Sequence, residues 1–446
     1  MKNILILGAG LSTASLIEYL LRHASDGKWK LTVADIDLET ARGKIGNHPQ
    51  GTAISLDIFN EKQTAEMISD ANMVISMLPA RFHPMVAAAC LEAGKSMITA
   101  SYVSPEMKRL DYQAKSRRLL FLNELGVDPG IDHMSAMRII DRIHGEGGRI
   151  LSFRSYTGGL IAPESDNNPW NYKFTWNPRN VVLAGQGTAS FIRNGEIKYI
   201  PYHQLFRRTF KTTVANLGEF DVYANRDSLN YREFYNLPDI PTLIRGTIRR
   251  AGFCEAWDLF VQLGMTDDSY VMENSESMTR RQYINSFLKY HATDSVERKV
   301  ARLFKVPEEG EIMKKLSWLG IFEERIIGLK NATPAQILQH LLEEKWKLEP
   351  DDKDMILMQH IFEYEMEGRK QQLKSSLVVV GTDQKHTAMA ITVGTPVAIA
   401  AKMLMNGEID EFGVKVPNTP NLYIPILDEL ETLGIRFIEE VREIRD

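Results

Sequence analysis

Cysteine is nearly absent from this sequence: Cys90 and Cys254 are the only two in 446 residues. Two thiols in so long a chain exclude a disulfide-stapled scaffold and a zinc or iron–sulfur site built from several cysteines. No other residues show metal-ligand spacing, so we predict no metal. Cys254 follows the apolar Phe253, and we expect it to pack rather than react.

Long hydrophobic runs and an excess of positive charge are also lacking. No apolar stretch approaches the ~18 residues that suggest a membrane span. Lys2 and the apolar residues of Ile4–Leu21 resemble a signal peptide, but Gly8, Gly10 and Glu18 interrupt that run. The chain has 53 Lys and Arg against 58 Asp and Glu, a net charge of −5, whereas a general nucleic-acid binder is expected to be basic. We therefore expect a cytoplasmic protein that binds neither membrane nor nucleic acid.

Residues 1–125 contain apolar runs that alternate with amphipathic segments such as Leu11–Arg22. This alternation predicts the α/β class, with a Rossmann-type, doubly wound parallel sheet. The predicted strands are Lys2–Leu7, Lys30–Ala34, Thr52–Leu56, Met73–Met77, Ser96–Ala100 and Leu119–Asn123.

The pattern changes from Arg149, where strand-like segments separated by Gly, Asn and Pro turns indicate a mixed sheet. Roughly Cys254–Gly368 is predicted to be mostly helical, and Asp351–Glu367 is expected to be a charged, solvated helix. Thr395–Gly407 is predicted to be a helix with Pro396 as its second residue.

Gly8-Ala9-Gly10 lies directly between a predicted buried strand and an amphipathic helix, which is the context of a dinucleotide fingerprint. The first glycine permits the tight turn, the second lets the backbone approach a pyrophosphate, and the helix N-terminus supplies free N–H groups. The third fingerprint position is Thr13 instead of Gly or Ala, and it is expected to crowd the contact between helix and strand.

Asp35 ends the second predicted strand, where a carboxylate typically binds the adenosine ribose 2′-hydroxyl and repels a 2′-phosphate. We therefore predict NAD as the preferred cofactor, with NADP as the alternative. The plainer interpretation is that Asp35 caps a helix over Leu38–Ile45. The predicted cofactor-binding residues are Gly8, Gly10, Leu11, Ser12, Thr13, Asp35, Ile36, Asp57, Leu78, Pro79 and Thr175.

Polar residues follow the fifth and sixth predicted strands, at the edge where a parallel sheet binds its ligands. Ser101 and Tyr102 follow the fifth strand, and Asp128 follows the sixth, within Gly126–Gly130. Asp128 beside Pro129 is alternatively a turn former. His133 is a candidate general base because it carries an imidazole, but a histidine in the first turn of a connecting helix is more often structural.

Arg226 lies in Asn225–Ser228, just after a strand-like segment. Its guanidinium fork suits a carboxylate substrate, and a surface salt bridge is the equally weighted alternative.

Several strings together resemble one known family, the glutamate-forming saccharopine dehydrogenases, also called saccharopine reductases. The resemblance covers nearly the whole chain, and its most specific strings are DPGIDHM, GGLIAPE and NRDS in this order. The strings lie in Leu122–Met137, Ser155–Glu164, Asn171–Trp176, Asn225–Ser228, Arg245–Trp257 and Ser375–Ala401.

The resemblance implies a fold of three parts. The dinucleotide-binding domain takes residues 1–130 and 388–446, and a mixed α/β substrate and dimerisation domain takes 131–262 and 373–387. A helical domain takes residues 263–372. A homodimer is the family expectation.

The implied reaction converts saccharopine, a nicotinamide cofactor and water reversibly to L-glutamate and 2-aminoadipate 6-semialdehyde, in lysine metabolism. Hydride leaves the lysine-derived C6 of saccharopine, water adds to the resulting imine, and the product splits. Asp128 and Tyr102 are the implied catalytic residues in supporting roles, with no single essential base. The implied substrate-binding residues are Ser101, Tyr102, Asp128, Gly130, Arg226, Gly246 and Thr247.

Two positions depart from the family pattern. Thr157 stands where many members are expected to have cysteine, which argues that a thiol is not required. Asp35 stands where the NADP-using fungal relatives are expected to have arginine, which favours NAD and a saccharopine-oxidising direction.

Two rival interpretations remain open. One is a carboxynorspermidine dehydrogenase-like imine reductase, whose polyamine substrate has fewer carboxylates. The other is a homologue that binds NAD(H) without turnover, and the presence of Arg226 and Tyr102 weighs against it.

Overall fold

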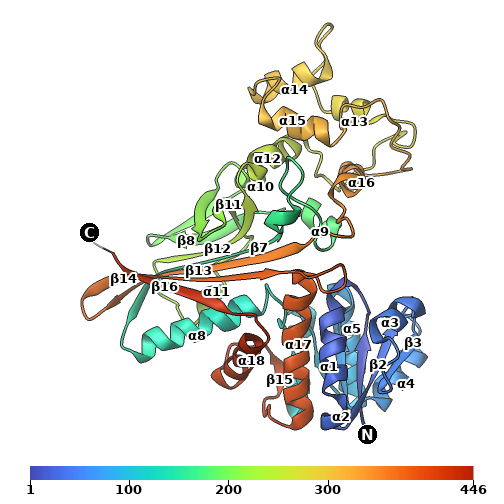
Figure 1. The fold of residues 1–446 in the computed structure, drawn as a ribbon, viewed down its shortest axis with the longest axis vertical. Coiled ribbons are helices and arrows are strands. Elements are labelled where there is room, and N and C mark those ends of the chain that lie inside the picture. Colours follow the sequence, from blue (N-terminus) through green and yellow to red (C-terminus); the bar gives the residue numbers. More distant parts are fainter. Residues whose placement is uncertain (445–446) are drawn as a thin grey trace. The chain divides into compact units, whose positions relative to one another are not determined.

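The computed structural model describes residues 1–444, and the chain divides into two compact units (Figure 1). Unit 1 consists of residues 1–150 and 364–446, and unit 2 consists of residues 151–363. The boundaries fall inside two long strands, β7 (Arg149–Ile161) and β13 (Asp354–Met366). The three-part division expected from the resemblance stays a prediction.

Unit 1 is built on a parallel sheet of seven strands in the order β15-β6-β5-β4-β1-β2-β3. Runs such as Ile4–Leu7 are buried, as expected for strands covered on both faces. The predicted doubly wound sheet is therefore confirmed, and its strands are β1 (Lys2–Leu7), β2 (Trp29–Asp35), β3 (Gly51–Ser55), β4 (Met73–Ser76), β5 (Ser96–Ile98), β6 (Leu120–Leu122) and β15 (Gly413–Lys415).

Helices connect these strands and cover the sheet, and a further antiparallel strand pair completes unit 1. The early helical elements are η1 (Leu11–Thr13), α1 (Ala14–Arg22), α2 (Ala24–Gly27), α3 (Leu38–Ile45), α4 (Glu61–Asp70), η2 (Ala80–Phe82), α5 (His83–Ala93), α6 (Pro105–Lys108), α7 (Asp111–Ser116) and α8 (Ile131–Gly145). The C-terminal part adds β14 (Arg369–Val380), α17 (Ala388–Asn406), α18 (Pro420–Thr432) and β16 (Phe437–Glu443), with β14 and β16 antiparallel.

Helix α17 begins seven residues before the predicted Thr395, at Ala388, so Pro396 lies inside the helix rather than in its first turn. The Thr387 side chain caps the start by accepting the Ala390 N–H at 3.0 Å. Among residues 1–444, α17 is the one helix long and apolar enough to cross a membrane, and 72% of its most apolar window is buried inside the protein. It lies beside α1, and a Cβ on its Gly394 would come within 2.8 Å of the Ser12 carbonyl oxygen (Figure 1).

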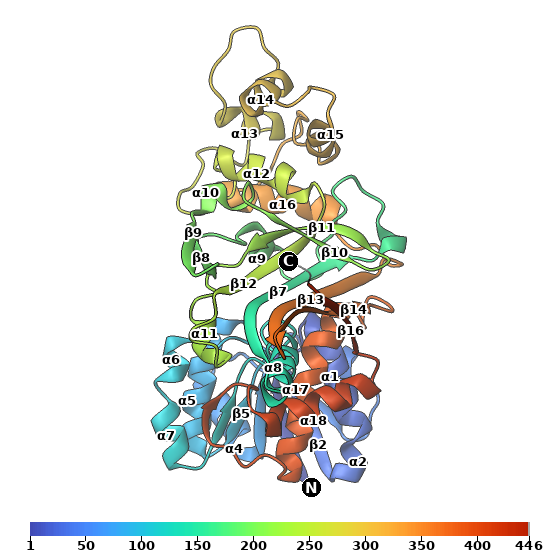
Figure 2. The same ribbon diagram turned by 90° about the vertical axis from the view of Figure 1, so that its left-hand side faces the viewer.

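Unit 2 contains a mixed sheet in which β10, β11, β12, β7 and β13 are successive neighbours (Figure 2). The pairs β10–β11 and β11–β12 are antiparallel, and β12–β7 is parallel. The remaining strands are β8 (Ala189–Arg193), β9 (Glu196–Ile200), β10 (Phe210–Val214), β11 (Gly218–Ala224) and β12 (Thr242–Arg250), of which β8 pairs with β9 and β12.

Large aromatic side chains form the core between this sheet and the helices of unit 2. The Trp170 and Trp346 rings, for example, are 5.4 Å apart and both fully buried. The helical elements are η3 (Pro163–Ser165), α9 (Pro178–Val182), α10 (Tyr202–Leu205), α11 (Tyr231–Phe234), α12 (Phe253–Leu263), α13 (Arg280–Ser286), α14 (Val296–Phe304), α15 (Glu311–Trp318) and α16 (Pro334–Trp346).

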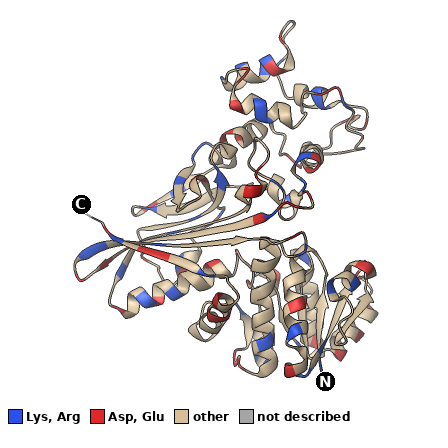
Figure 3. Cartoon of the chain, in the orientation of Figure 1, with Lys and Arg blue, Asp and Glu red and all other residues tan. Residues whose placement is uncertain are grey.

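The predicted helix over Asp351–Glu367 is wrong, because β13 occupies Asp354–Met366. Nine consecutive residues from Asp354 to Phe362 are buried, as in a strand covered on both faces. The charged residues at the two ends of the segment led to the prediction of a solvated helix. Elsewhere, Lys and Arg are interspersed with Asp and Glu on the helices of both units (Figure 3).

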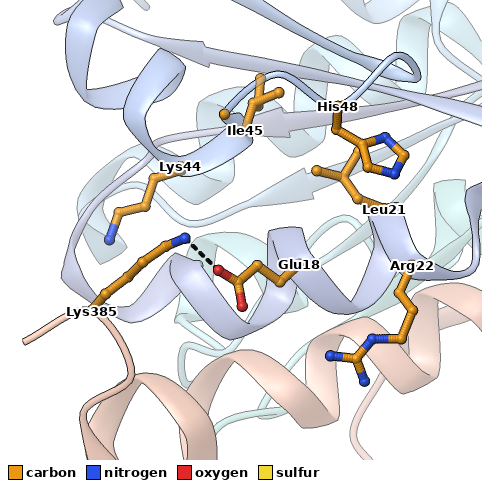
Figure 4. A pocket seen from close by; sticks show the side chains of 8 residues that line it. Glu18, Leu21, Arg22, Lys44, Ile45, His48 and Lys385 are labelled. Carbon is orange, nitrogen blue, oxygen red and sulfur yellow. Dashed lines mark ion pairs between the residues drawn. The ribbon is translucent and has the colours of Figure 1, made fainter. Parts of the chain in front are cut away.

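A cavity of about 310 Å³ lies beside α1 and α3 (Figure 4). Lys385 and His386, which precede α17, both pair with Glu18 of α1, and His386 Nε2 lies 2.7 Å from Glu18 Oε2. Burial, together with the charge of Lys385, lowers the pKa of Lys44, which also lines the cavity. These pairs fasten the start of α17 to α1.

We predict that His386 stabilises unit 1 in a pH-dependent way. Hydrogen bonds to Asp383 and to Glu18 raise the pKa of His386 above its ordinary value. The stabilisation is therefore complete below the ordinary pKa of about 6.5 and is lost as the pH rises through the raised value. Thermal unfolding should show that His386→Gln lowers the midpoint more at acidic than at alkaline pH, and an equal loss at both would contradict this.

Candidate functional site

The strand order of unit 1 places one candidate site at the carboxyl edge of its sheet. Adjacent strands β1 and β4 lead into helices on opposite faces, and ligands of doubly wound sheets bind at such a switch point. The residues that follow β1, β4, β5 and β6 therefore share this edge. The predicted residues there are Gly8, Gly10, Leu11, Ser12, Thr13, Leu78, Pro79, Ser101, Tyr102, Asp128 and Gly130.

The turn after β1 requires glycine and leaves room for a ligand. Gly8 has φ +95°, and a Cβ on it would meet the Met77 carbonyl oxygen at 3.0 Å, so this turn packs against the end of β4. A Cβ on Gly10 would meet nothing within 4 Å, so space lies in front of this residue.

The helix N-terminus at Gly10 carries no side-chain cap. The first amides of a helix have no acceptor within the helix, so those of Leu11 and Ser12 suit an anion. Thr13 is buried, and its hydroxyl donates to the Gly10 carbonyl at 2.8 Å. This loop fits the pyrophosphate of a dinucleotide.

Asp35 fastens the loop to the end of β2. Its Oδ2 accepts the Ala9 N–H at 2.7 Å, and its Oδ1 accepts the Asp37 N–H at 3.0 Å. Asp37, not Asp35, caps α3, by accepting the Glu39 N–H at 3.0 Å. Both oxygens of Asp35 thus accept backbone N–H groups. The position of Asp35 alone does not show whether the cofactor carries a hydroxyl or a phosphate on the ribose 2′ carbon.

The other predicted cofactor residues of unit 1 lie around the same edge. Ile36 is exposed directly after β2. Asp57 follows β3 and accepts the Phe59 N–H at 3.0 Å in a local turn. Leu78 and Pro79 follow β4, and the Leu78 N lies 3.3 Å from the position of a Cβ on Gly8.

Tyr102 and Asp128, the predicted catalytic residues, form a hydrogen-bonded pair. The Tyr102 hydroxyl donates to Asp128 Oδ1 at 2.9 Å, although the two residues come from loops after different strands. Tyr102 is 47% exposed, so the pair is accessible to solvent. A carboxylate in contact with a phenol is a reasonable group for proton transfer.

A buried cluster of Glu124, Asp132 and His133 holds these two loops. Glu124 accepts the Val103 N–H at 3.1 Å, next to Tyr102, and Asp132 accepts the Gly130 N–H at 2.7 Å, close to Asp128. His133, fully buried, lies 3.3 Å from a carboxylate oxygen of each acid. The burial of His133 favours the structural role expected from its place in the first turn of α8.

The predicted residues of unit 2 lie on β12 and on the NRDS string after β11. Thr247 donates its hydroxyl to Asn225 Oδ1 at 2.8 Å, and Ser228 Oγ accepts the Arg245 N–H at 2.9 Å. Asp227 accepts the Leu229 N–H at 2.8 Å. Three of the four residues in this string are thus held within the fold.

Arg226 is the exposed member of the string. Within residues 1–444 its guanidinium has no hydrogen-bond or ion-pair partner, so the predicted alternative of a surface salt bridge does not apply. The fork remains available for a carboxylate.

Gly246 and two threonines complete the predicted set in unit 2. A Cβ on Gly246 would lie 2.6 Å from Val222 Cγ1 and 2.9 Å from the Tyr223 carbonyl oxygen, so close strand packing requires this glycine. Thr157 is the partner of Thr247 on the neighbouring strand β7. Thr157 and the predicted cofactor residue Thr175 are buried, and neither hydroxyl has a protein partner within residues 1–444.

No group of three or more His, Cys, Asp and Glu residues able to hold a metal ion occurs in the described part of the chain. Both cysteines are buried, and burial raises the pKa of each thiol, which makes the reactive thiolate scarce.

Two family models match the chain. "Saccharopine dehydrogenase NADP binding domain" matches residues 4–122, and "Saccharopine dehydrogenase C-terminal domain" matches residues 126–435. Together they span almost the whole sequence.

Curated relatives agree with these matches. The L-glutamate-forming, NADP(+) saccharopine dehydrogenase of Schizosaccharomyces pombe is 34% identical over 99% of each chain. The Saccharomyces cerevisiae enzyme of the same name is 33% identical over 96% of this chain and 97% of its own. Mitochondrial alpha-aminoadipic semialdehyde synthase of Bos taurus is 32% identical over 98% of this chain, which corresponds to 47% of that longer protein.

Solved structures show which known proteins share this fold. Apo saccharopine dehydrogenase (L-Glu forming) from Saccharomyces cerevisiae superposes with a TM-score of 0.90 at 31% identity, over 99% of this chain and 100% of that one. Homospermidine synthase from Legionella pneumophila reaches 0.58 at 8% identity over 99% of this chain and 91% of its own, and so shares only the fold.

The prediction of NAD as the preferred cofactor is wrong. The family model over residues 4–122 describes an NADP-binding domain, and the fungal relatives are named for NADP(+). The prediction relied on the position of Asp35 alone, and in the structure this carboxylate holds the Ala9 and Asp37 amides, a role that is compatible with either cofactor.

We predict that Asp35 acts on cofactor binding through the Ala9 amide. Asp35→Ala and Asp35→Asn both remove the charge, but only asparagine keeps an oxygen that can accept the Ala9 N–H. At about 1 kcal/mol per net hydrogen bond, the alanine variant should bind NADPH roughly fivefold more weakly than the asparagine variant. Fluorescence titration with NADPH measures both dissociation constants, and equal values would show that only the charge matters.

We also predict that Gly130→Ala disrupts the loop that carries Asp128. Gly130 has φ +147°, and a Cβ there would lie 2.1 Å from the Gly126 carbonyl oxygen. The variant should lose most of its activity and several degrees of thermal stability. Gly145→Ala at the other end of α8 is the matched control: its Cβ meets nothing within 4 Å, so it should be neutral or stabilising. A Gly130→Ala variant as active and stable as Gly145→Ala would contradict the prediction.

Proposed function

The chain belongs to the saccharopine dehydrogenase family, and on this premise we propose that it is an oxidoreductase that converts saccharopine, NADP+ and water to L-glutamate and 2-aminoadipate 6-semialdehyde, in lysine metabolism. The observation that carries the proposal is the match over the full length of the L-glutamate-forming enzymes, with the Tyr102–Asp128 pair at the ligand edge. The expected homodimer and cytoplasmic location stay predictions.

The proposed reaction balances as follows. A hydride leaves the lysine-derived C6 of saccharopine, which makes the carbon–nitrogen bond an imine. Water adds to that carbon and loses a proton. The carbon–nitrogen bond then breaks, with the electron pair and a proton going to the nitrogen, which becomes the amino group of glutamate. NADP+, when bound, supplies the hydride acceptor.

The residues of unit 1 are proposed to bind the cofactor and to move protons. Leu11 and Ser12 would donate backbone N–H groups to the pyrophosphate, and the Asp35 carboxylate keeps their loop in place. Asp128 takes up and returns the proton of the amine and of the attacking water, and Tyr102 stabilises that carboxylate by its hydrogen bond. Ser101 and Gly130 are proposed substrate contacts.

The residues of unit 2 are proposed to bind substrate carboxylates. Arg226 offers a charged fork without a competing partner within residues 1–444, and Gly246 and Thr247 supply polar atoms of β12. Saccharopine carries three carboxylates, so Arg226 is one of several groups that bind them. Thr175 stays a predicted cofactor contact.

The proposal is tested by following the appearance of reduced nicotinamide with saccharopine and NADP+, with NAD+ in parallel. Carboxynorspermidine and homospermidine serve as amines with fewer carboxylates. Turnover of saccharopine with NADP+, and little with the polyamines, is expected. Polyamine oxidation in place of saccharopine oxidation would overturn the substrate, and cofactor binding without oxidation of any amine would overturn the enzymatic function.

We predict that removing Asp128 slows turnover without abolishing it. Positioned acids and bases commonly contribute about 10²- to 10⁴-fold, and water can substitute for part of that. We expect kcat of Asp128→Ala to fall by about 10²-fold, near the lower end of this range. Tyr102→Phe, which only removes the donor to Asp128, should show a smaller effect. Complete loss of turnover in Asp128→Ala, with NADPH binding and thermal stability intact, would show instead that Asp128 is the essential base.

We predict that Arg226 acts on saccharopine binding alone. A hydrogen-bonded charge pair is worth about 1.5–3 kcal/mol, so Arg226→Ala should raise the KM for saccharopine roughly 10- to 100-fold. The KM for NADP+ should not change. Arg208→Ala, another exposed arginine of unit 2, is the matched control and should leave both constants unchanged. An unaltered KM for saccharopine in Arg226→Ala would remove this residue from the site.

A further inference from the structure

His83, the first residue of α5, joins the ends of two strands at the ligand edge of unit 1. Its Nδ1 lies 2.8 Å from Ser76 Oγ, which ends β4. Its Nε2 lies 2.7 Å from Ser101 Oγ and 3.2 Å from Thr99 Oγ1, both just after β5. The imidazole thus holds hydroxyl groups from two neighbouring strands.

Three of these four side chains are closed to solvent. His83 is 4% exposed, Thr99 is 1% exposed and Ser76 is fully buried. Ser101 is only partly buried, so it is the member of the cluster that reaches the edge where ligands bind. Its neighbour Tyr102 carries the hydrogen bond to Asp128.

Burial lowers the pKa of His83 to about 4, so the imidazole is neutral at physiological pH. A neutral imidazole has one N–H donor and one acceptor nitrogen, with the Ser76 hydroxyl at Nδ1 and the Ser101 and Thr99 hydroxyls at Nε2. On the side away from Ser101 the cluster ends at the buried Ser76 hydroxyl, so it offers no onward route for a proton from Ser101 to solvent. The arrangement suits holding a group in place rather than transferring a proton.

We propose that His83 is a positioning residue that fixes the Ser101 hydroxyl for contact with the substrate. The proposal rests on the function proposed above, in which Ser101 binds saccharopine. A free serine side chain samples three staggered rotamers. The hydrogen bond to His83 restricts the side chain of Ser101. The Ser101 N–H, which donates to Thr99 Oγ1 at 3.3 Å, restricts its backbone.

Asparagine and glutamine provide a matched pair of substitutions for His83. The amide of asparagine reaches about as far as Nδ1 of histidine and can keep the bond to Ser76, whereas that of glutamine reaches about as far as Nε2 and can keep the bond to Ser101. His83→Asn should therefore raise the KM for saccharopine roughly three- to tenfold, the value of one net hydrogen bond. His83→Gln should stay close to the wild-type protein.

Two further readouts separate positioning from a general structural defect. In His83→Asn, kcat and the KM for NADP+ should change less than about twofold, well below the effect of one net hydrogen bond on the KM for saccharopine. The pH dependence of kcat should keep its midpoints. A shift of those midpoints, or equal losses in His83→Asn and His83→Gln, would overturn the positioning role.

A double-mutant cycle with Ser101→Ala tests whether His83 affects the KM for saccharopine through Ser101. If His83 acts through Ser101, His83→Asn should not change the KM for saccharopine in a Ser101→Ala background. Additive effects would overturn the inference. So would a raised KM in Ser101→Ala with a normal KM in His83→Asn. A normal KM in Ser101→Ala itself would instead remove Ser101 from the proposed substrate site, which is a separate failure.

Ser76→Ala keeps the proposal testable if His83→Asn does not fold. It deletes only the anchor at Nδ1 and leaves the imidazole in place. The variant should raise the KM for saccharopine, and it should have no effect in the Ser101→Ala background. An unchanged KM in Ser76→Ala with an intact Ser101 would overturn the proposed anchoring.

Discussion

The parallel register of the strands in unit 1 is the constraint on which its candidate site depends. Strands β1, β4, β5 and β6 all run in the same direction, so their carboxyl ends meet at one edge. Gly8, His83, Ser101 and Asp128 are separated by many residues in the chain, yet each follows one of these strands. Antiparallel pairing of any one of them would send its following loop to the opposite edge.

Hydrogen bonds within the fold then distinguish the polar side chains that hold the structure from those that remain available for a ligand. Asp35 accepts two backbone amides, and His133 lies 3.3 Å from two carboxylates, although both residues have the chemistry of a binding or catalytic group. In unit 2, the NRDS string shows the same division: three of its side chains secure the loop, and Arg226 is left exposed. The residue type alone does not separate these roles, because the separation depends on partners that are distant in the sequence.

The sequence was sufficient wherever a local pattern determines structure. Buried strands appear as short apolar runs, so the six strands from β1 to β6 were predicted within a few residues. Strand β15 has a single apolar residue between glycine and lysine, so no apolar run marks it, and its place depends on pairing with β6. Strand β13 was mistaken for a helix because its charged ends hid a buried run. Neither the His83 cluster nor the anchoring of Asp35 had a local signal, and both arise only when separate strands come together.

In the proposed reaction, oxidation occurs on the lysine-derived side of the secondary amine, so that the nitrogen leaves with glutamate. The most direct measurement is to incubate the protein and NADP+ with saccharopine that carries a heavy-nitrogen label in the secondary amine and deuterium at C6, and to identify the products by mass spectrometry. We predict labelled glutamate, deuterium in the reduced cofactor and 2-aminoadipate 6-semialdehyde. Labelled lysine together with 2-oxoglutarate would contradict it, because the opposite carbon–nitrogen bond would then have been cleaved.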